Sequence, residues 1–238
     1  MKRIIIIGAS SGIGREIARI YARHGDKIGI TGRRNELLHS LKPEFPENIS
    51  MSCFDATVPD SILHIEDLIK ELGGLDLLIY CAGYGEPSKT LDWAIDKTTV
   101  DINVNGFLRI VNFAFNYFVE QGRGQLVTIS SIASRRGNDY APAYSAGKAF
   151  QSTYFEGLHM KLKKLKLPVY VTDVQPGFVD TKMAKSTKLF WVAPVEKAAR
   201  QIVDAIEKKK WRVYITRRWA IIAWLLKWIP DSIYFRLR

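Results

Sequence analysis

The chain has 238 residues, of which 47% are apolar and 25% charged, a composition typical of a globular protein. A chain of this length buries about 70% of the surface that it exposes when unfolded, which excludes a dependence on disulfide bonds. The formal net charge of +11 is unevenly placed, because residues 196–238 hold 11 Lys and Arg against 4 Asp and Glu. This excess suits a phosphate-bearing ligand or an anionic membrane surface, and it also occurs on ordinary solvated faces. The positive charge is the only feature that favours nucleic-acid binding, and we expect no such binding.

Short apolar runs alternate with longer amphipathic segments, the pattern of parallel strands joined by crossover helices. We therefore predict the α/β class, with a doubly wound, seven-stranded parallel sheet in a single domain over residues 1–215. The predicted strands are Arg3–Ile7, Lys27–Thr31, Ile49–Cys53, Leu75–Tyr80, Gln125–Ser130, Val169–Val174 and Arg212–Ile215. The predicted helices begin near Gly12, Asn35, Thr57, Leu91, Asn103, Pro142 and Val195. Residues 216–238 form a C-terminal hydrophobic and basic helical extension.

The cysteines and the two ends of the chain indicate the cellular compartment in which we expect the protein. Cys53 and Cys81 lie apart in apolar runs, which favours buried thiols in a reducing compartment over a disulfide or a zinc site. Lys2 and Arg3 precede an apolar run that is too short for a signal peptide and lacks a cleavage pattern. The longest uncharged run near the end, Trp219 to Leu226, has eight residues, whereas a membrane-spanning helix needs about 20. We expect a cytoplasmic protein with no membrane span and no metal site.

A glycine-rich segment, Gly8-Ala-Ser-Ser-Gly12-Ile-Gly14, follows the first predicted strand and opens a helix. Glycine permits a tight turn and a close approach of the backbone, and a helix N-terminus offers free N–H groups to an anion. We therefore predict a loop that binds the pyrophosphate of a dinucleotide. The alternative is an ordinary turn between a strand and a helix.

The second predicted strand ends at Thr31-Gly32-Arg33-Arg34, without a carboxylate. In dinucleotide-binding folds an acidic side chain at this place binds the adenosine ribose, whereas a basic one accommodates a 2′-phosphate. The sequence thus predicts NADP(H) in preference to NAD(H), with Arg33 as the main contact and Arg34 as a helper. The alternative is a pair of solvated arginines at the start of a helix.

Tyr144 and Lys148 are four residues apart on a predicted helix and so share one face. A neighbouring ammonium favours the phenolate and lowers the pKa of a tyrosine from about 10 by roughly 1–3 units. Ser131 follows a predicted strand, and a parallel sheet brings its hydroxyl to the carboxyl edge, where ligands bind. Asn103 opens another predicted helix and is either a ligand-side residue or a cap. Simple packing of Tyr144 and Lys148 is the alternative for this pair.

From Arg3 to about Ile215 the chain resembles the short-chain dehydrogenase/reductase family, in its one-domain Rossmann branch. The motifs that carry the resemblance are the Gly-x3-Gly-x-Gly loop, Asp55 in Phe-Asp-Ala-Thr, Ala82-Gly83, Asp101-x-Asn103-x-x-Gly106, Ser131, the Tyr-x3-Lys pair and Pro176-Gly177-x-x-x-Thr181. Two positions depart from the family pattern. Tyr80-Cys81 stands where the family has Asn-Asn, and Ile7 where it has threonine. These departures imply a cofactor site that is either looser than in the family or supported by other groups.

The resemblance implies an NADP(H)-dependent oxidoreductase that transfers hydride between nicotinamide and a carbonyl or alcohol. Tyr144 would be the general acid or base, and Ser131 would hold the substrate oxygen. Lys148 would lower the pKa of the tyrosine and bind the nicotinamide ribose, while Asn103 would hold a water that passes protons to the lysine. The alternative is a catalytically silent NADP-binding regulator or redox sensor, against which the presence of all four catalytic residues argues.

The resemblance also implies the cofactor contacts. Asp55 would meet the adenine amine, although such a residue is otherwise a cap or turn residue, and Val179 and Thr181 would contact the nicotinamide amide and a nearby phosphate. The full expected set is Gly8, Ser10, Ser11, Gly12, Ile13, Gly14, Arg33, Arg34, Asp55, Ala82, Gly83, Tyr144, Lys148, Pro176, Gly177, Val179 and Thr181.

The substrate pocket is expected between the segments 84–89, 132–140 and 178–191, beneath a mobile lid. The candidate lining residues are Tyr84, Ile132, Tyr140, Phe178, Met183, Phe190 and Trp191, and their apolar character suggests a lipophilic substrate. Burial of these aromatics as ordinary core is the alternative. Arg135 and Arg136 suit an acidic substrate or plain solvation.

Residues 217–230 predict a helix that ends before Pro230 and carries Trp219, Trp224 and Trp228 between basic flanks. Such a helix suits an anchor on anionic lipid, and equally a subunit interface or a flap over the pocket. The family resemblance further implies a homodimer or homotetramer formed through the helices that begin near Asn103 and Pro142.

Overall fold

The computed structural model describes residues 1–88, 90–183 and 190–236, and its centre is a seven-stranded, all-parallel sheet in the order β3-β2-β1-β4-β5-β6-β7. The strands are β1 (Arg3–Ile7), β2 (Lys27–Gly32), β3 (Ile49–Cys53), β4 (Leu77–Tyr80), β5 (Gly124–Ile129), β6 (Val169–Pro176) and β7 (Arg212–Ile215). The predicted single-domain, doubly wound α/β fold is confirmed, with strand ends shifted by one or two residues.

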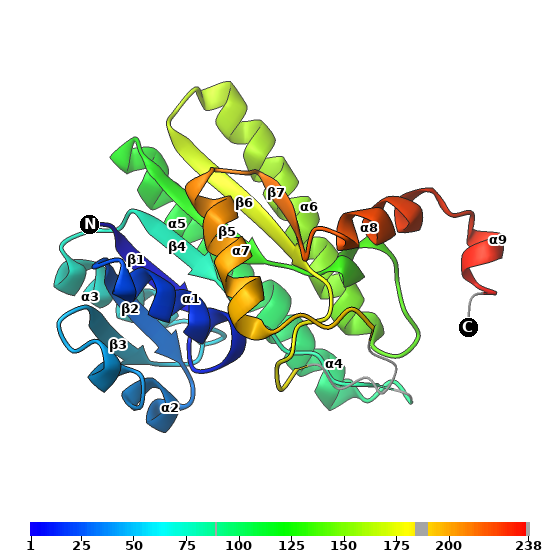
Figure 1. Ribbon diagram of the computed structural model, residues 1–238, viewed down its shortest axis with the longest axis horizontal. Coiled ribbons are helices and arrows are strands. Elements are labelled where there is room, and N and C mark those ends of the chain that lie inside the picture. The colour runs from blue at the N-terminus through cyan, green and yellow to red at the C-terminus, as the bar shows by residue number, and fades with distance from the viewer. Residues whose placement is uncertain (89, 184–189, 237–238) are drawn as a thin grey trace.

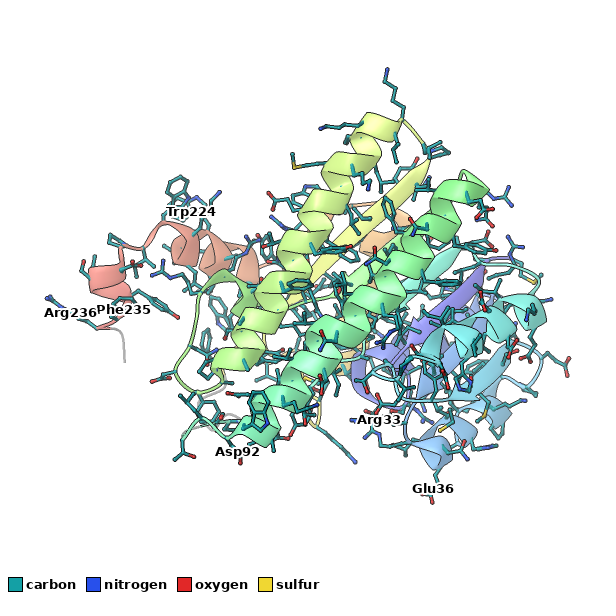
Figure 2. The ribbon with its side chains drawn as sticks, turned by 180° about the vertical axis from the view of Figure 1, so that it is seen from behind. Arg33, Glu36, Asp92, Trp224, Phe235 and Arg236 are labelled. Atoms are coloured by element: carbon teal, nitrogen blue, oxygen red, sulfur yellow. The ribbon has the colours of Figure 1, made fainter. Side chains whose placement is uncertain are left out.

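Helices cover both faces of the sheet. In Figure 1, α1 (Gly12–Arg23) and α7 (Val195–Glu207) lie in front of the sheet, and α2 (Asn35–His39) packs on the same side through Leu38. The view from behind in Figure 2 shows α5 (Phe107–Gln121) and α6 (Pro142–Leu165) side by side, with α3 (Ser61–Leu72) on the same face. The remaining elements are α4 (Trp93–Val100), α8 (Trp219–Trp228), α9 (Asp231–Tyr234), η1 (Lys42–Glu44) and η3 (Ile132–Arg135).

The interior position of β1 in the sheet explains the unbroken apolar run at the start of the chain. Ile4 and Ile6 pack into the core beneath α1 and α7, whereas Ile5 and Ile7 pack into the core beneath α3, α5 and α6. The sheet continues from β1 through β2 on one side and from β1 through β4 on the other. Loops that leave the carboxyl ends of β1 and β4 therefore diverge, and ligands of doubly wound sheets bind in this crevice.

The predicted break between a helix near Leu91 and another near Asn103 is wrong. A π-helical turn, η2 (Asp101–Gly106), joins α4 directly to α5, so that Asn103 lies inside one continuous helical stretch. The N-cap of α4 is Asp92, whose carboxylate accepts a hydrogen bond from the Ala94 N–H at 2.8 Å. Asn103 is fully buried and is not a cap.

The prediction of two buried thiols is wrong for Cys53, which is exposed. The reason is its place at the end of β3, because β3 is an edge strand and its last residue faces solvent. Cys81 is half-buried, and both cysteines are free.

The C-terminal residues form an arm that leaves the body of the molecule beside β7 and η3 (Figure 1). The predicted helix that ends before Pro230 is confirmed as α8, and the short helix α9 follows it. Trp219 and Ala223 are buried on the inner side of α8. The division of the chain at residue 215 stays a prediction. No helix within the described part of the chain is long and apolar enough to cross a membrane.

Candidate active site

The glycine loop closes tightly over the carboxyl end of β1. The N–H groups of Gly8 and Ala9 both donate to the Thr31 carbonyl oxygen, at 3.1 and 2.8 Å. Gly8 has a φ of +91°, and a Cβ there would lie 2.6 Å from the Ala82 nitrogen, so only glycine fits. A Cβ on Gly14 would lie 2.3 Å from the Gly8 carbonyl oxygen. The turn thus delivers the chain directly from β1 to the start of α1.

The start of α1 fits an anionic group. Ser11 occupies the N-cap position without a side-chain hydrogen bond to the helix, so the first turn keeps free N–H groups that attract a phosphate. Thr181 closes the same space from the other side, because a Cβ on Gly12 would lie 3.3 Å from its methyl group. The geometry therefore fits the expected pyrophosphate loop, and it brings together Gly12, Ser11 and Thr181 from distant parts of the sequence.

The two arginines after β2 lie at the edge of this loop. The Arg34 guanidinium donates to the hydroxyls of Ser10 and Ser11, each at 2.7 Å. Arg33 is more exposed, is labelled in Figure 2, and has one guanidinium nitrogen 3.5 Å from the Asp55 carboxylate. Both cations stand where the 2′-phosphate of an adenosine ribose is expected, and Arg34 is bonded more closely to the loop than the sequence indicated.

Asp55 accepts hydrogen bonds from the Thr57 N–H at 2.9 Å and from the Thr57 hydroxyl at 2.8 Å. Burial raises the pKa of its carboxyl, but the hydrogen bonds from Thr57 and the charge of Arg33 outweigh this, so the pKa lies below its usual value. Asp55 thus forms the turn before α3, and its contact with adenine stays a prediction.

Tyr144 lies on the first turns of α6, and its ring covers the backbone of Gly85, where a Cβ would lie 2.3 Å from the ring. Ser131 lies close enough to its hydroxyl to lower the pKa of Tyr144. Ser131 caps η3, and its side-chain oxygen accepts from the Ala133 N–H at 3.1 Å. Two hydroxyls from separate elements therefore meet at the carboxyl edge of β5, as the sequence predicted.

The pKa of Tyr144 differs from the expectation. Burial raises it above its ordinary value, and the hydrogen bond from Ser131 lowers it only in part. The Lys148 nitrogen is 5.8 Å from the centre of the Tyr144 ring and donates its hydrogen bonds elsewhere. Desolvation of the phenolate is therefore the largest influence on this pKa in the protein alone, and Lys148 is not among the groups that shift it.

Lys148 is buried, and its ammonium donates to the Ile129 carbonyl at 2.8 Å and to the Gln151 side-chain oxygen at 3.1 Å. An ammonium has three N–H donors, so one is left for a ligand such as a ribose. Burial lowers the pKa of Lys148 to about 8, although the charges of Cys81 and Asp173 act in the opposite direction. A Cβ on Gly83 would lie 3.2 Å from the ammonium, which explains a glycine at this position.

Asn103 fastens the loop after β4 to the helical turn η2. Its side-chain oxygen accepts from the Tyr84 N–H at 3.0 Å, and its amide nitrogen donates to the Tyr84 carbonyl at 2.7 Å. The Asn103 backbone carbonyl accepts from the Gln151 amide nitrogen at 3.0 Å. Gln151 therefore spans the space between Asn103 and Lys148 where the resemblance implied a water molecule.

Tyr80, one of the departures from the family pattern, has a clear structural role. Its buried hydroxyl donates to the Ile102 carbonyl at 2.7 Å. A π-helical turn leaves carbonyl groups without their usual helical partners, and in this chain Tyr80 and Gln151 supply partners for two successive ones. Sequence reasoning missed Gln151, because a glutamine on a helix gives no signal until its neighbours are known.

The segments that should enclose the substrate gather near this site. Phe178 contacts Phe190 and Trp219, with ring centres 5.7 and 5.3 Å apart. Nearby, Val179 and Ala193 form an isolated parallel β-bridge. Phe190, Trp191 and Met183 are exposed, as is Tyr140, whereas Ile132 and Tyr84 are half-buried. Within the expected pocket segments, positions 89 and 184–189 lie outside the described residues.

Trp219 was not among the candidate pocket residues, although a flap over the pocket was one of the alternatives for its helix. It is 2% exposed, and a Cβ on Gly177 would lie 2.0 Å from its ring. The first turn of α8 thus packs directly on the Pro176-Gly177 turn that is expected beside the nicotinamide. The ring N–H of Trp219 has no hydrogen-bond partner among the described residues.

The arginines of η3 and its end are held by other groups. Arg135 donates to the Gln175 side chain at 3.0 Å and to the Tyr214 hydroxyl at 2.5 Å. Arg136 pairs with Asp231 of α9 at 2.5 Å and lies over the Tyr234 ring. Arg136 therefore fastens the C-terminal arm to the body. Among the described residues, no three His, Cys, Asp or Glu side chains are grouped so that they could hold a metal ion.

Comparisons with known proteins agree with this geometry. The family model for short chain dehydrogenase matches residues 2–190. An oxidoreductase of Myxococcus xanthus is 37% identical over 185 residues, which cover 75% of this chain and 72% of that protein. One of Mycobacterium tuberculosis is 29% identical over 244 residues and covers 98% of this chain and 95% of that protein.

Solved structures show the same fold. Serine dehydrogenase from Escherichia coli is 28% identical, covers 74% of this chain and 82% of that chain, and has a TM-score of 0.66. A 7beta-hydroxysteroid dehydrogenase is 20% identical, covers 98% of this chain and 95% of that chain, and has a TM-score of 0.84. With the glycine loop, the Ser131–Tyr144 contact and the buried Lys148 in place, the chain belongs to the short-chain dehydrogenase/reductase family of nicotinamide-dependent oxidoreductases.

Proposed function

We propose that this protein is an NADP(H)-dependent reductase that interconverts a lipophilic carbonyl compound and its alcohol, with Tyr144 as general acid and base. The observation that carries the proposal is the grouping of Tyr144 with the buried ammonium of Lys148, 5.8 Å from its ring, and with Ser131, which lies near enough to lower the pKa of the phenol. A carbonyl oxygen placed between the two hydroxyls would accept a hydrogen bond from each, which opposes the charge that develops on oxygen during reduction.

Nicotinamide, when bound, supplies or accepts the hydride. Tyr144 gives its proton to the substrate oxygen during reduction, and the charge of Lys148 stabilises the phenolate that remains. Ser131 would hold the same oxygen by turning its hydroxyl proton from Tyr144 to the substrate, while its own oxygen accepts from the Ala133 N–H. The Ile129 carbonyl and the Gln151 side-chain oxygen keep the Lys148 ammonium in place while the hydride and the proton are transferred.

Tyr144→Phe tests the chemistry. It removes one hydroxyl and should lower kcat for carbonyl reduction by about 10²–10⁴-fold, the usual contribution of a general acid. NADPH binding should persist, and NADPH at about 100 times its Kd should still stabilise the variant by about 2.7 kcal/mol in a melting experiment. The readout is NADPH absorbance across a panel of ketones and aldehydes of increasing chain length. Normal turnover by this variant would contradict the role of Tyr144.

The preference for NADP(H) rests on Arg33 and Arg34 at the glycine loop. Arg33→Ala should weaken NADPH binding by about tenfold or more, the contribution of a charge-assisted hydrogen bond, and should leave NADH binding within about twofold. Arg23→Ala, at the far end of α1, is the matched control. An unchanged ratio of NADPH to NADH affinity in the Arg33 variant would overturn the preference.

A catalytically silent NADP-binding regulator is the second candidate. It would bind NADPH with normal affinity and turn over none of the carbonyl panel. The oligomeric state and the cytoplasmic location expected from the sequence stay predictions.

A further inference from the structure

The outward side of α8 carries a continuous apolar stripe, formed by Ile221, Trp224, Leu225 and Trp228. These positions follow the spacing i, i+3, i+4 and i+7, so they share one face of the helix. Their exposed fractions are 60%, 62%, 48% and 65%. We call these four residues the outer stripe. Ile233 and Phe235 are also exposed on the arm, and Figure 2 shows the Trp224 side chain projecting from α8.

The outer stripe is flanked by positive charge. Exposed cations stand before α8, in its last turn and after α9, namely Arg217, Arg218, Lys227 and Arg236. The Lys227 nitrogen lies 5.3 Å from the centre of the Trp228 ring, beside the stripe itself. Within residues 216–236 the sequence has one acidic residue, Asp231, and its carboxylate already pairs with Arg136. The free charge of this surface is therefore positive, which matches an anionic partner.

The opposite side of α8 leads to the pocket. Trp219 packs against Gly177 and contacts Phe178, Phe190 and Trp191, with ring centres 5.3, 5.1 and 6.0 Å apart for the last three. Arg218 lies over the exposed Trp191 ring at 5.0 Å. One short helix thus joins an exposed, cationic and apolar surface to the aromatic rim of the substrate site.

We infer that the outer stripe docks on the surface of an anionic lipid bilayer, and that the pocket draws its lipophilic carbonyl substrate from that bilayer. The second half of this inference rests on the proposed function. Ten residues of helix are about 15 Å long, too short to span a bilayer and suited to lying in its interface. Trp rings favour the interface, and the flanking cations add attraction to anionic headgroups.

Flotation of the full chain with lipid vesicles tests the docking. The probes are vesicles of phosphatidylcholine alone and of an equimolar mixture of phosphatidylcholine and phosphatidylglycerol. We expect the bound fraction to correspond to at least about tenfold tighter binding to the anionic vesicles, with the difference reduced by salt. Absence of binding to either vesicle, or equal binding to both at low salt, would overturn the inference.

Two pairs of variants separate the apolar and the charged contributions. Trp224→Ser with Trp228→Ser should weaken binding to both vesicles by about tenfold or more, because buried aromatic area is lost. Lys227→Gln with Arg236→Gln should weaken binding to the anionic vesicles alone, by about fivefold per cation.

Matched controls lie elsewhere on the surface. Trp93→Ser alters a side chain that is 76% exposed on α4, next to Asp92, which Figure 2 shows far from Trp224. Lys163→Gln with Lys164→Gln removes two exposed cations from the end of α6. Both should bind like the parent chain, and an equal loss in them would overturn the assignment to α8. If the parent chain were a dimer that bound no vesicles, and the double substitution at Trp224 and Trp228 dissociated it, the outer stripe would be a subunit interface instead.

Activity tests the delivery of substrate. Anionic vesicles should raise kcat/KM for a long-chain ketone by about tenfold and leave a short, water-soluble ketone unchanged, and the Trp224 and Trp228 pair should lose only the increase. Delivery from the bilayer would be overturned if vesicles raised kcat/KM of the Trp224 and Trp228 variant as much as that of the parent chain. It would also be overturned if the parent chain bound the vesicles without any rise in its kcat/KM for the long-chain ketone. A chain that floats but reduces no carbonyl would contradict the proposed function and leave the docking supported.

Discussion

The carboxyl edge of the sheet and the C-terminal arm are built by opposite means. At the edge, the key side chains are buried and each makes two or more polar contacts, as Asn103 does with Tyr84 and Lys148 with Ile129 and Gln151. The arm is joined to the body through the Trp219 rings and the pair of Arg136 with Asp231, and most of its large side chains face outward. The comparison teaches that Asn103 and Lys148 are held in place by several hydrogen bonds from other elements, whereas the arm exposes an apolar surface.

The largest expected effect within the edge concerns Lys148. Its pKa of about 8 means that the ammonium is lost as the pH rises through that value, so carbonyl reduction should fall by up to about tenfold per pH unit above it. Lys148→Met should lower kcat by about 100-fold or more at every pH. Lys148→Arg should abolish the decline near pH 8, because a guanidinium stays charged there. Rates of NADPH oxidation from pH 6 to 10 provide the measurement.

Unfolding does not account for that decline. The folded-state pKa of Lys148 lies below its unfolded value of about 10.5, so the folded protein binds fewer protons between these values. The cost of burying the charge is fully present below pH 8 and is relieved as the pH rises, so this group makes the fold more stable across the window. A melting temperature that falls in step with activity would contradict this assignment.

Gln151 is the next test, because it joins Lys148 to the carbonyl of Asn103. Gln151→Leu removes an oxygen that stabilises the charged lysine, so the decline in activity should move to lower pH and kcat at pH 7 should fall by about tenfold. Gln151→Glu should move the decline to higher pH, because a carboxylate favours the ammonium more strongly. A residue that only packed the core would move neither curve.

Gln125→Leu is the matched control for Gln151. Gln125 likewise has two hydrogen-bond partners, since its amide nitrogen donates to the Thr172 hydroxyl and the Ile206 carbonyl, each at 3.1 Å, but it lies at the other end of the sheet. Its loss should lower the melting temperature and leave the pH profile in place. A shift of the profile in this variant would show that any buried glutamine acts on the site through stability.

Sequence reasoning predicted the parts of this molecule that follow from local pattern. The alternation of apolar runs located β1 to β7, and the spacing of Tyr144 and Lys148 placed both on one face of α6. It failed where the outcome depends on position in the sheet or on neighbours distant in sequence. Cys53 is exposed because β3 lies at the edge, and Asn103 lies within a helix because a π-turn joins two helical segments without a break.

The balance of the pKa of Tyr144 could not be read from spacing either. The proximity of Lys148 argues for a lower value, but the burial of the phenol raises it by more, and burial depends on the loop that holds Gly85 against the ring. Gln151 and Tyr80 likewise gain their roles only when the helical turn η2 presents two carbonyls to them. The motifs led to the candidate residues of the site, whereas the residues that support them in the fold could not be read from the sequence.

Tyr80→Phe should have the smallest effect on activity among these variants. It tests whether the hydrogen bonds to the helical turn η2 affect activity as well as stability. It leaves the buried Ile102 carbonyl without its partner, which should cost about 1–3 kcal/mol of unfolding free energy and lower Tm by about 2–4 °C for each kcal/mol. Because Ile102 precedes Asn103 in the same turn, kcat should also fall, by about threefold. Tyr21→Phe removes another buried hydroxyl, bonded to Glu207 at 3.0 Å beneath α7, and should lower Tm without changing kcat. If both variants lost the same activity, the polar edge would be no more than stable core, and its contrast with the C-terminal arm would reduce to burial alone.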